Sequence, residues 1–157
     1  MKMKYYFATM LLLLVLPQAQ ARSIAFWPYQ KLVDSSDLVA IVEVASVEKT
    51  NVVWQDRGDP KRFQSYVAHA DVAWTIKGAQ KTKKIDLVFF KYAETPGVQI
   101  EDNGALFVDF RDPDKHQYLV FLRKGTGESF VPTTGHYDAS ISVKEIKNDG
   151  FSHPDGK

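Results

Sequence analysis

The sequence predicts a mainly β protein that forms a small antiparallel barrel, closed or partly open, with little helix. Short apolar segments recur roughly every ten residues, and clusters of Gly, Pro, Asn and Asp separate them. The first of these segments changes the parity of its alternation, which indicates a bulged and bent strand of the kind that closes small barrels. No linker, internal repeat or low-complexity tract interrupts residues 22–147, so we expect one domain.

The elements follow in chain order, beginning with the two strands that are easiest to recognise. A helical turn at 32–36 leads into a first strand at 37–48, where the parity change places a β-bulge near Ala45 and Ser46. Residues 51–60 have the composition of a loop. In the second strand, alternation predicts a core-facing set of six residues. These are Tyr66, Ala68, Ala70, Val72, Trp74 and Ile76.

The second half of the chain contains shorter strands and more turns. The expected elements are a strand at 85–90, a hairpin at 98–110 with Asp102-Asn103-Gly104 at its tip, a strand at 118–122 that is buried on both faces, a short strand at 130–131 and a last strand near 141–146. Residues 148–157 are polar and contain glycine and proline, so we expect a flexible C-terminal tail.

Residues 1–21 have the features of a signal peptide. Two lysines precede an apolar stretch at 5–16, and a proline separates that stretch from Ala19-Gln20-Ala21, a small-x-small cleavage pattern. The apolar stretch is shorter than the ~20 residues that a membrane-spanning helix needs. A retained N-terminal anchor is the alternative. We expect an exported chain, periplasmic or secreted and bacterial, that begins near Arg22 and does not insert into a membrane after cleavage.

Composition narrows the classes of partner and chemistry. The chain has 20 Lys and Arg against 19 Asp and Glu, and cleavage of the signal peptide would leave a net charge near zero. Such a domain lacks the basic face that displaces counterions from nucleic acid, so we expect no nucleic-acid partner. The absence of cysteine from the sequence excludes disulfides, a thiol nucleophile and a cysteine-based zinc site.

Several segments resemble the netrin-like modules, the OB-fold barrels that include the tissue inhibitors of metalloproteinases. Ser36-Asp37-Leu38-Val39-Ala40-Ile41 resembles their opening strand. The later segments that match in order are Asp59-Pro60-Lys61-Arg62, the strand end Ile76-Lys77-Gly78, the strand 85–90, and Tyr118-Leu119-Val120. The resemblance covers residues 32–146 and implies a netrin-like OB-fold barrel, a layout shared by bacterial exported proteins of unassigned role.

The chain departs from that family at the residue that its inhibitors use. Those inhibitors chelate the zinc of a protease through the α-amine and carbonyl of an N-terminal cysteine. The expected mature start of this chain is Arg22-Ser23-Ile24, and no cysteine is present. Protease inhibition is therefore only a minor alternative, because a shared fold does not transfer function.

The histidines suggest no strong catalytic or metal site. His69 and Asp71 share one face of a predicted strand, so the carboxylate could orient the imidazole, although the polar outer face of a strand explains both residues equally well. A polar loop places Ser129 and Asp138 near His136 in sequence. It contains no nucleophile elbow, and no metal-ligand spacing of the HExxH type occurs. We expect no enzymatic activity, no cofactor and no metal, with a hydrolase as a minor alternative.

Seven side chains are candidates for binding. The three aromatic residues within 26–29 surround a proline; they could contact a partner or, as we favour, fold back and cover one end of the barrel. Trp54 could stack against a sugar or pack under its loop, and the lysine turn at 81–84 could dock an acidic surface. The candidates are Phe26, Trp27, Tyr29, Trp54, Lys81, Lys83 and Lys84.

These features together predict a module that binds a protein partner in the periplasm or outside the cell. Binding of an envelope or extracellular glycan is the alternative. It requires that Trp54 and the lysine turn share one face of the barrel.

Overall fold

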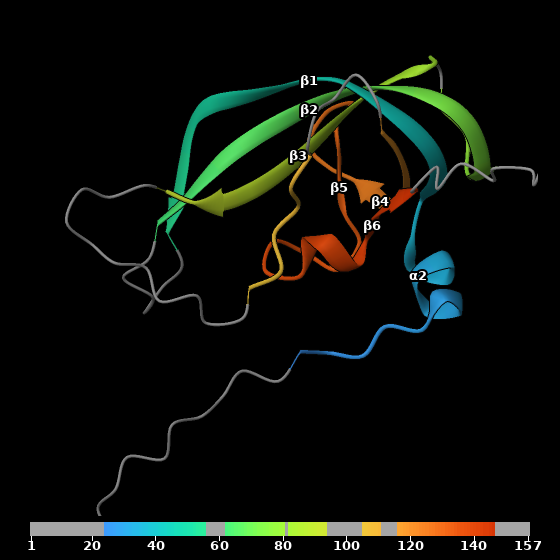
Figure 1. Ribbon diagram of the computed structural model, residues 1–157, viewed down its shortest axis with the longest axis horizontal. Helices are drawn as coiled ribbons and strands as arrows, with labels where there is room; N and C mark the ends of the chain where they lie inside the picture. The colour runs from blue at the N-terminus through green and yellow to red at the C-terminus, as the bar shows by residue number, and fades with distance from the viewer. Residues whose placement is uncertain (1–23, 56–61, 81, 94–104, 111–115, 147–157) are drawn as a thin grey trace, which may run out of the picture.

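The computed structural model describes residues 24–55, 62–80, 82–93, 105–110 and 116–146. The predicted signal peptide, Lys81 and the predicted C-terminal tail lie outside these residues. The elements are α2 (Tyr29–Ser35), β1 (Leu38–Gln55), β2 (Arg62–Lys77), β3 (Lys84–Tyr92), β4 (Gln117–Lys124), β5 (Phe130–Pro132), the short helix η3 (Ala139–Ile141) and β6 (Val143–Ile146) (Figure 1). No described helix is both long and apolar enough to cross a membrane.

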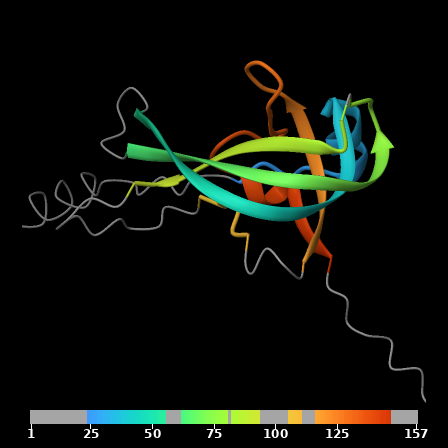
Figure 2. The same cartoon turned by 90° about the horizontal axis from the view of Figure 1, so that it is seen from above.

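The six strands form one sheet that closes on itself. Their order is β1-β2-β3-β5-β4-β6, and β1 also pairs with β4, so that β1 to β5 complete a ring. The pairings are antiparallel except between β3 and β5, which meet in parallel at Leu87 and Phe130. The long, curved strands β1, β2 and β3 arch over β4, β5 and β6 and cross them steeply (Figures 1 and 2). The prediction of a small, mainly β barrel is confirmed.

The bend in β1 comes from one extra residue in its pairing with β2. Val44 pairs with Ala70, and Ser46 pairs with His69, so Ala45 has no residue opposite it. A bulge of this kind bends a strand and increases its twist. The bulge predicted near Ala45 and Ser46 is confirmed.

β1 continues further than its sequence predicts, because residues 51–55 belong to the strand and not to a loop. Its pairing is irregular between Lys49 and Val53. In this irregular stretch the buried Gln64 side chain supplies hydrogen bonds to the backbone. Its Nε2 donates to the Thr50 carbonyl at 2.6 Å and to the Val52 carbonyl at 3.2 Å.

The predicted core face of β2 is correct only as far as Val72. Val72 pairs with Val42, but Trp74 pairs with Ile41, which leaves Ala73 as an extra residue. The extra residue reverses the alternation of side chains. As a result Trp74 is 68 % exposed. Ile76 is a second extra residue, between Thr75 and Lys77, and is 55 % exposed. The prediction of both as core residues is wrong.

The barrel interior is filled by apolar side chains from every strand of the ring. Each large side chain buried there contributes about 1.5–3 kcal/mol. This main core contains Leu38, Ala40, Val42, Val44, Ala68, Ala70, Val72, Ile85, Leu87, Phe89, Val108, Tyr118, Val120, Leu122, Phe130, Ala139 and Val143.

The helix α2 covers part of the outer face of the barrel, and it begins three residues before the predicted helical turn. Its Leu32 packs on Val39 and Phe121 to form a second, smaller apolar cluster. Two contacts hold the C-terminal end of the helix. Ser36 Oγ donates to the Leu32 carbonyl at 2.6 Å, and Lys77 Nζ, from the end of β2, donates to the Val33 carbonyl at 2.7 Å.

The predicted hairpin at 98–110 falls partly outside the described residues, and its described part, 105–110, is not a strand. This segment runs beside the residues that lead into η3. The Leu106 amide donates to the Tyr137 carbonyl at 2.7 Å, and the Ser140 amide donates to the Leu106 carbonyl at 2.9 Å. The last strand, β6, is shorter than predicted because η3 occupies the positions before it.

Candidate functional site

Of the three aromatic residues within 26–29, one is covered in the structure and two are exposed. Trp27 packs against the second apolar cluster, and Lys31 Nζ lies 4.2 Å from the centroid of its ring. Phe26 is 85 % exposed and Tyr29 is 62 % exposed, although the Tyr29 ring still approaches Phe121 with 6.0 Å between centroids. Trp27 therefore covers the outer wall of the barrel, while Phe26 and Tyr29 are free to contact another molecule.

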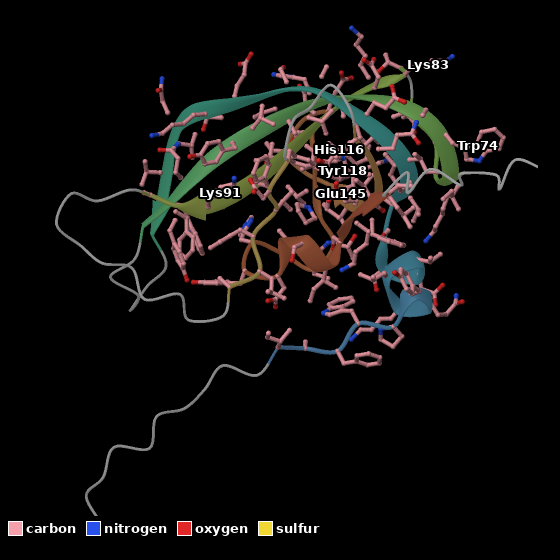
Figure 3. The ribbon with its side chains drawn as sticks, viewed as in Figure 1. Trp74, Lys83, Lys91, His116, Tyr118 and Glu145 are labelled. Atoms are coloured by element: carbon pink, nitrogen blue, oxygen red, sulfur yellow. The ribbon has the colours of Figure 1, made fainter. Side chains whose placement is uncertain are left out.

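An apolar row on the outer face of the sheet lies next to this segment. Trp74 on β2 pairs with Ile41 on β1, and Ile41 pairs with Leu119 on β4. Ile41 and Leu119 are partly buried, and Leu119 also packs against the second apolar cluster under α2. Figure 3 shows Trp74 on the side of the molecule where α2 lies. Sequence alternation missed this row because it assigned Trp74 to the core.

Trp54 packs within an aromatic cluster and does not stand exposed on a loop. It lies on β1 opposite Phe63, with 5.2 Å between the ring centroids. Its ring is also 6.3 Å from that of Phe90 and 5.6 Å from that of His136. Of the two interpretations of Trp54, the packed side chain is the one that this geometry supports.

His136 is the titratable member of that cluster. Its ring centroid is 4.3 Å from that of Phe90, and its Nδ1 is buried without a hydrogen-bond partner among the described residues. Burial, and to a smaller extent the positive charge of Arg123, lowers the pKa of His136 below its ordinary value of 6.5. His136 is therefore neutral at pH 7 and resists protonation in the folded protein.

We expect this lowered pKa to make stability depend on pH. Above pH 6.5 the imidazole is neutral in both the folded and the unfolded chain. As the pH falls through 6.5, the unfolded chain binds the proton first, so folding stability decreases until the lower, folded-state pKa is passed. Urea unfolding at pH 8 and at pH 5 should show a smaller decrease for His136→Phe than for the wild type. Equal decreases in both proteins would contradict the expectation.

The lysine turn lies at the other end of β3 from Trp54. Lys84 begins β3, whereas Tyr92 ends it and pairs with Phe63, the residue opposite Trp54. A strand of this length spans roughly 25–30 Å. The glycan alternative requires that Trp54 and the lysine turn share one face, but Trp54 and Lys84 lie at opposite ends of β3.

The two described lysines of the turn differ in their surroundings. Both Lys83 and Lys84 are exposed, and Lys81 lies outside the described residues. Lys83 projects outward from the turn (Figure 3). Lys84 instead lines a cavity of about 430 Å³ between the start of β3 and the loop that joins β4 to β5. We call this cavity the β3–β5 pocket.

The other two described histidines, His69 and His116, pair with carboxylates from other strands. His69 Nδ1 lies 2.7 Å from Asp86 Oδ1 on β3, so its partner is not Asp71 as the sequence suggested. His116 Nδ1 lies 2.8 Å from Glu145 Oε1 (Figure 3). Within the described part of the chain, no three His, Asp or Glu side chains gather closely enough to hold a metal ion.

The hydroxyl groups near His136 form hydrogen bonds that hold the loop after β5 in place. Thr134 Oγ1 donates to the Asp138 carbonyl at 2.6 Å, and Thr133 Oγ1 lies 2.8 Å from Ser36 Oγ. These bonds tie the loop after β5 to η3 and to the end of α2. They do not assemble a nucleophile and a base.

The amino-acid sequence was also compared with known proteins. It matches no model of a protein family and no curated protein.

Proposed function

We propose that this chain is an exported, non-enzymatic interaction module with a netrin-like OB-fold barrel, which binds a protein partner through the outer face beside α2. The observation that carries the proposal is the exposure of Phe26, Tyr29 and Trp74. The row of Ile41 and Leu119 connects Trp74 to the second apolar cluster, which Tyr29 also approaches. Exposed aromatic side chains invite aggregation unless a partner covers them, and Trp and Tyr are the commonest interface anchors. Export is proposed from the signal-like residues 1–21.

Two further features support this proposal. The ring of five strands has the closure expected of an OB-fold, which supports the netrin-like resemblance. The apolar row is built on three hydrogen-bonded strands, so its backbone is already ordered before a partner binds. A preordered surface loses little conformational entropy on association. Glycan binding through a joint surface of Trp54 and the lysine turn is less well supported, because the two lie at opposite ends of β3.

We expect Trp74 to anchor the partner. A photo-crosslinking residue at position 76, which is 55 % exposed beside Trp74, should give one dominant protein adduct in cells that express the full chain. Removing an interface anchor costs ~2 kcal/mol or more, so Trp74→Ala should reduce the yield of that adduct at least about tenfold. Mass spectrometry would identify and quantify the adduct.

Val52 provides the matched control. It is 58 % exposed on the irregular part of β1, far along the strand from Ile41. Val52→Ala should leave the adduct yield unchanged, and a crosslinker at position 52 should not capture the same protein. Equal loss of the adduct in both variants, or no saturable adduct at position 76, would refute the proposed surface.

A further inference from the structure

The β3–β5 pocket lies beside the one parallel pairing among the described strands. β3 and β5 pair at Leu87 and Phe130 and run in the same direction. The residues just before this pair, 84–86 and 127–129, therefore form two walls that face each other, and six of the eleven lining residues come from these walls. The volume of about 430 Å³ lies within the range of small-molecule sites, roughly 300–1,000 Å³.

Hydrogen bonds hold both walls in place without a ligand. In the β4–β5 loop, the Gly125 amide donates to the Ser129 carbonyl at 2.8 Å, and Ser129 Oγ donates to the Thr126 carbonyl at 2.8 Å. In the opposite wall, Thr82 Oγ1 donates to the Lys84 carbonyl at 2.7 Å. The pocket is therefore preformed, which reduces the entropic cost of binding.

The uncharged polar groups of the pocket offer acceptors. Ser129 and Thr82 have each given their hydroxyl hydrogen to a carbonyl, so their oxygens keep lone pairs that can accept a hydrogen bond. Gln80 Nε2 donates to Thr75 Oγ1 at 3.0 Å, and its Oε1 is buried without a partner among the described residues. The buried Gln80 oxygen is closed to a ligand, and a ligand that suits the Ser129 and Thr82 oxygens must carry hydrogen-bond donors such as hydroxyl groups.

The charged groups of the pocket are two lysines and two carboxylates, and the lysines offer donors to a ligand carboxylate. Lys84 and Lys124 both line the pocket, and neither ammonium group forms an ion pair with a described residue. The carboxylates of the lining are occupied: Asp86 lies 2.7 Å from His69 Nδ1, and Glu128 has a contact of its own. These contacts do not cancel the negative charges, so the lining holds two positive and two negative side chains. Its two ammonium groups are the charged donors that have no ion-pair partner among the described residues.

We propose that the β3–β5 pocket binds a polyhydroxylated carboxylate, the chemistry of a uronic acid. The carboxylate lies between Lys84 and Lys124, and the ring hydroxyls donate to the oxygens of Ser129 and Thr82. This site is separate from the protein-binding surface beside α2, so either proposal can fail without the other.

Titration of the isotope-labelled protein with glucuronic and galacturonic acids, followed by NMR, tests the site. We expect saturable shifts in the amides of residues 82–86 and 127–130. Lys84→Gln and Lys124→Gln should each raise the dissociation constant at least about tenfold, because each removes one charge-assisted hydrogen bond. Glucose, which lacks the carboxylate, and acetate, which lacks the hydroxyls, should both bind at least about tenfold more weakly than the uronic acids.

Two controls make the result specific. Lys49→Gln removes an exposed lysine from β1, away from the pocket, and should leave the affinity for uronic acid unchanged. Trp74→Ala should also leave it unchanged, which separates this site from the proposed protein interface. The proposal is wrong if neither uronic acid gives saturable shifts in the pocket, if glucose binds as tightly, or if all three lysine variants weaken binding equally.

Discussion

Gly78→Ala should be among the most destabilising single substitutions in this protein. Gly78 directly follows β2 with a φ of +90°, and a Cβ atom there would collide with the backbone carbonyl of Asp37. Asp37 cannot move away freely, because its amide donates to the Leu122 carbonyl at 2.8 Å and its Oδ2 accepts from the Lys124 amide at 2.8 Å. We expect the free energy of unfolding, measured with urea, to fall by more than about 3 kcal/mol.

Gly135→Ala separates the collision from the cost of the backbone conformation. Gly135 has a similar φ of +83°, but a Cβ atom there would meet no atom within 4 Å. This variant should lose only the ~1–2 kcal/mol that a side chain costs in the left-handed region. If the two variants are equally stable, the collision with the Asp37 carbonyl adds nothing to the cost of the positive φ at Gly78.

The contrast between β1 and β2 shows which bulges a sequence reveals. In β1 the apolar residues on either side of Ala45 fall on opposite parities, so the extra residue is visible in the pattern. In β2 the bulge at Ala73 is hidden, because Val72, Trp74 and Ile76 continue the apolar alternation with no change of parity. Only the pairing of Trp74 with Ile41 on the neighbouring strand reveals that the side chain points outward.

The candidate sites were less predictable than the fold, because each is made by contacts between distant parts of the chain. Lys84 was recognised as part of a basic turn, but Lys124 joins it only through the pairing of Leu87 with Phe130. Likewise, the sequence places His136 near hydroxyl and carboxyl groups, but its burial beside Trp54 and Phe90 cannot be inferred from local spacing. Residue types indicate possible chemistry, and strand register decides which of them meet.

Phe63→Ala should cause a loss of stability comparable to that of Gly78→Ala, for a different reason. The Phe63 side chain is fully buried and lies at the centre of the aromatic cluster that closes the Trp54 end of the barrel. Its ring centroid is 5.1 Å from that of Tyr137 and 5.3 Å from that of Tyr92. These rings come from separate segments, so they cannot all move in to fill the space. We expect a loss of about 3–5 kcal/mol in urea unfolding, typical of a buried Phe→Ala substitution.

Two comparisons test whether the cavity itself causes this loss. Phe63→Leu retains most of the apolar volume and should cost less than about 1.5 kcal/mol. Trp74→Ala removes a larger ring, but one that is 68 % exposed, and should change stability by less than about 1 kcal/mol. If Phe63→Ala were no more harmful than Trp74→Ala, the aromatic cluster would contribute little to folding. If Trp74→Ala leaves the stability unchanged, Trp74 does not serve the fold. Partner binding then explains why an exposed tryptophan stands on the apolar row.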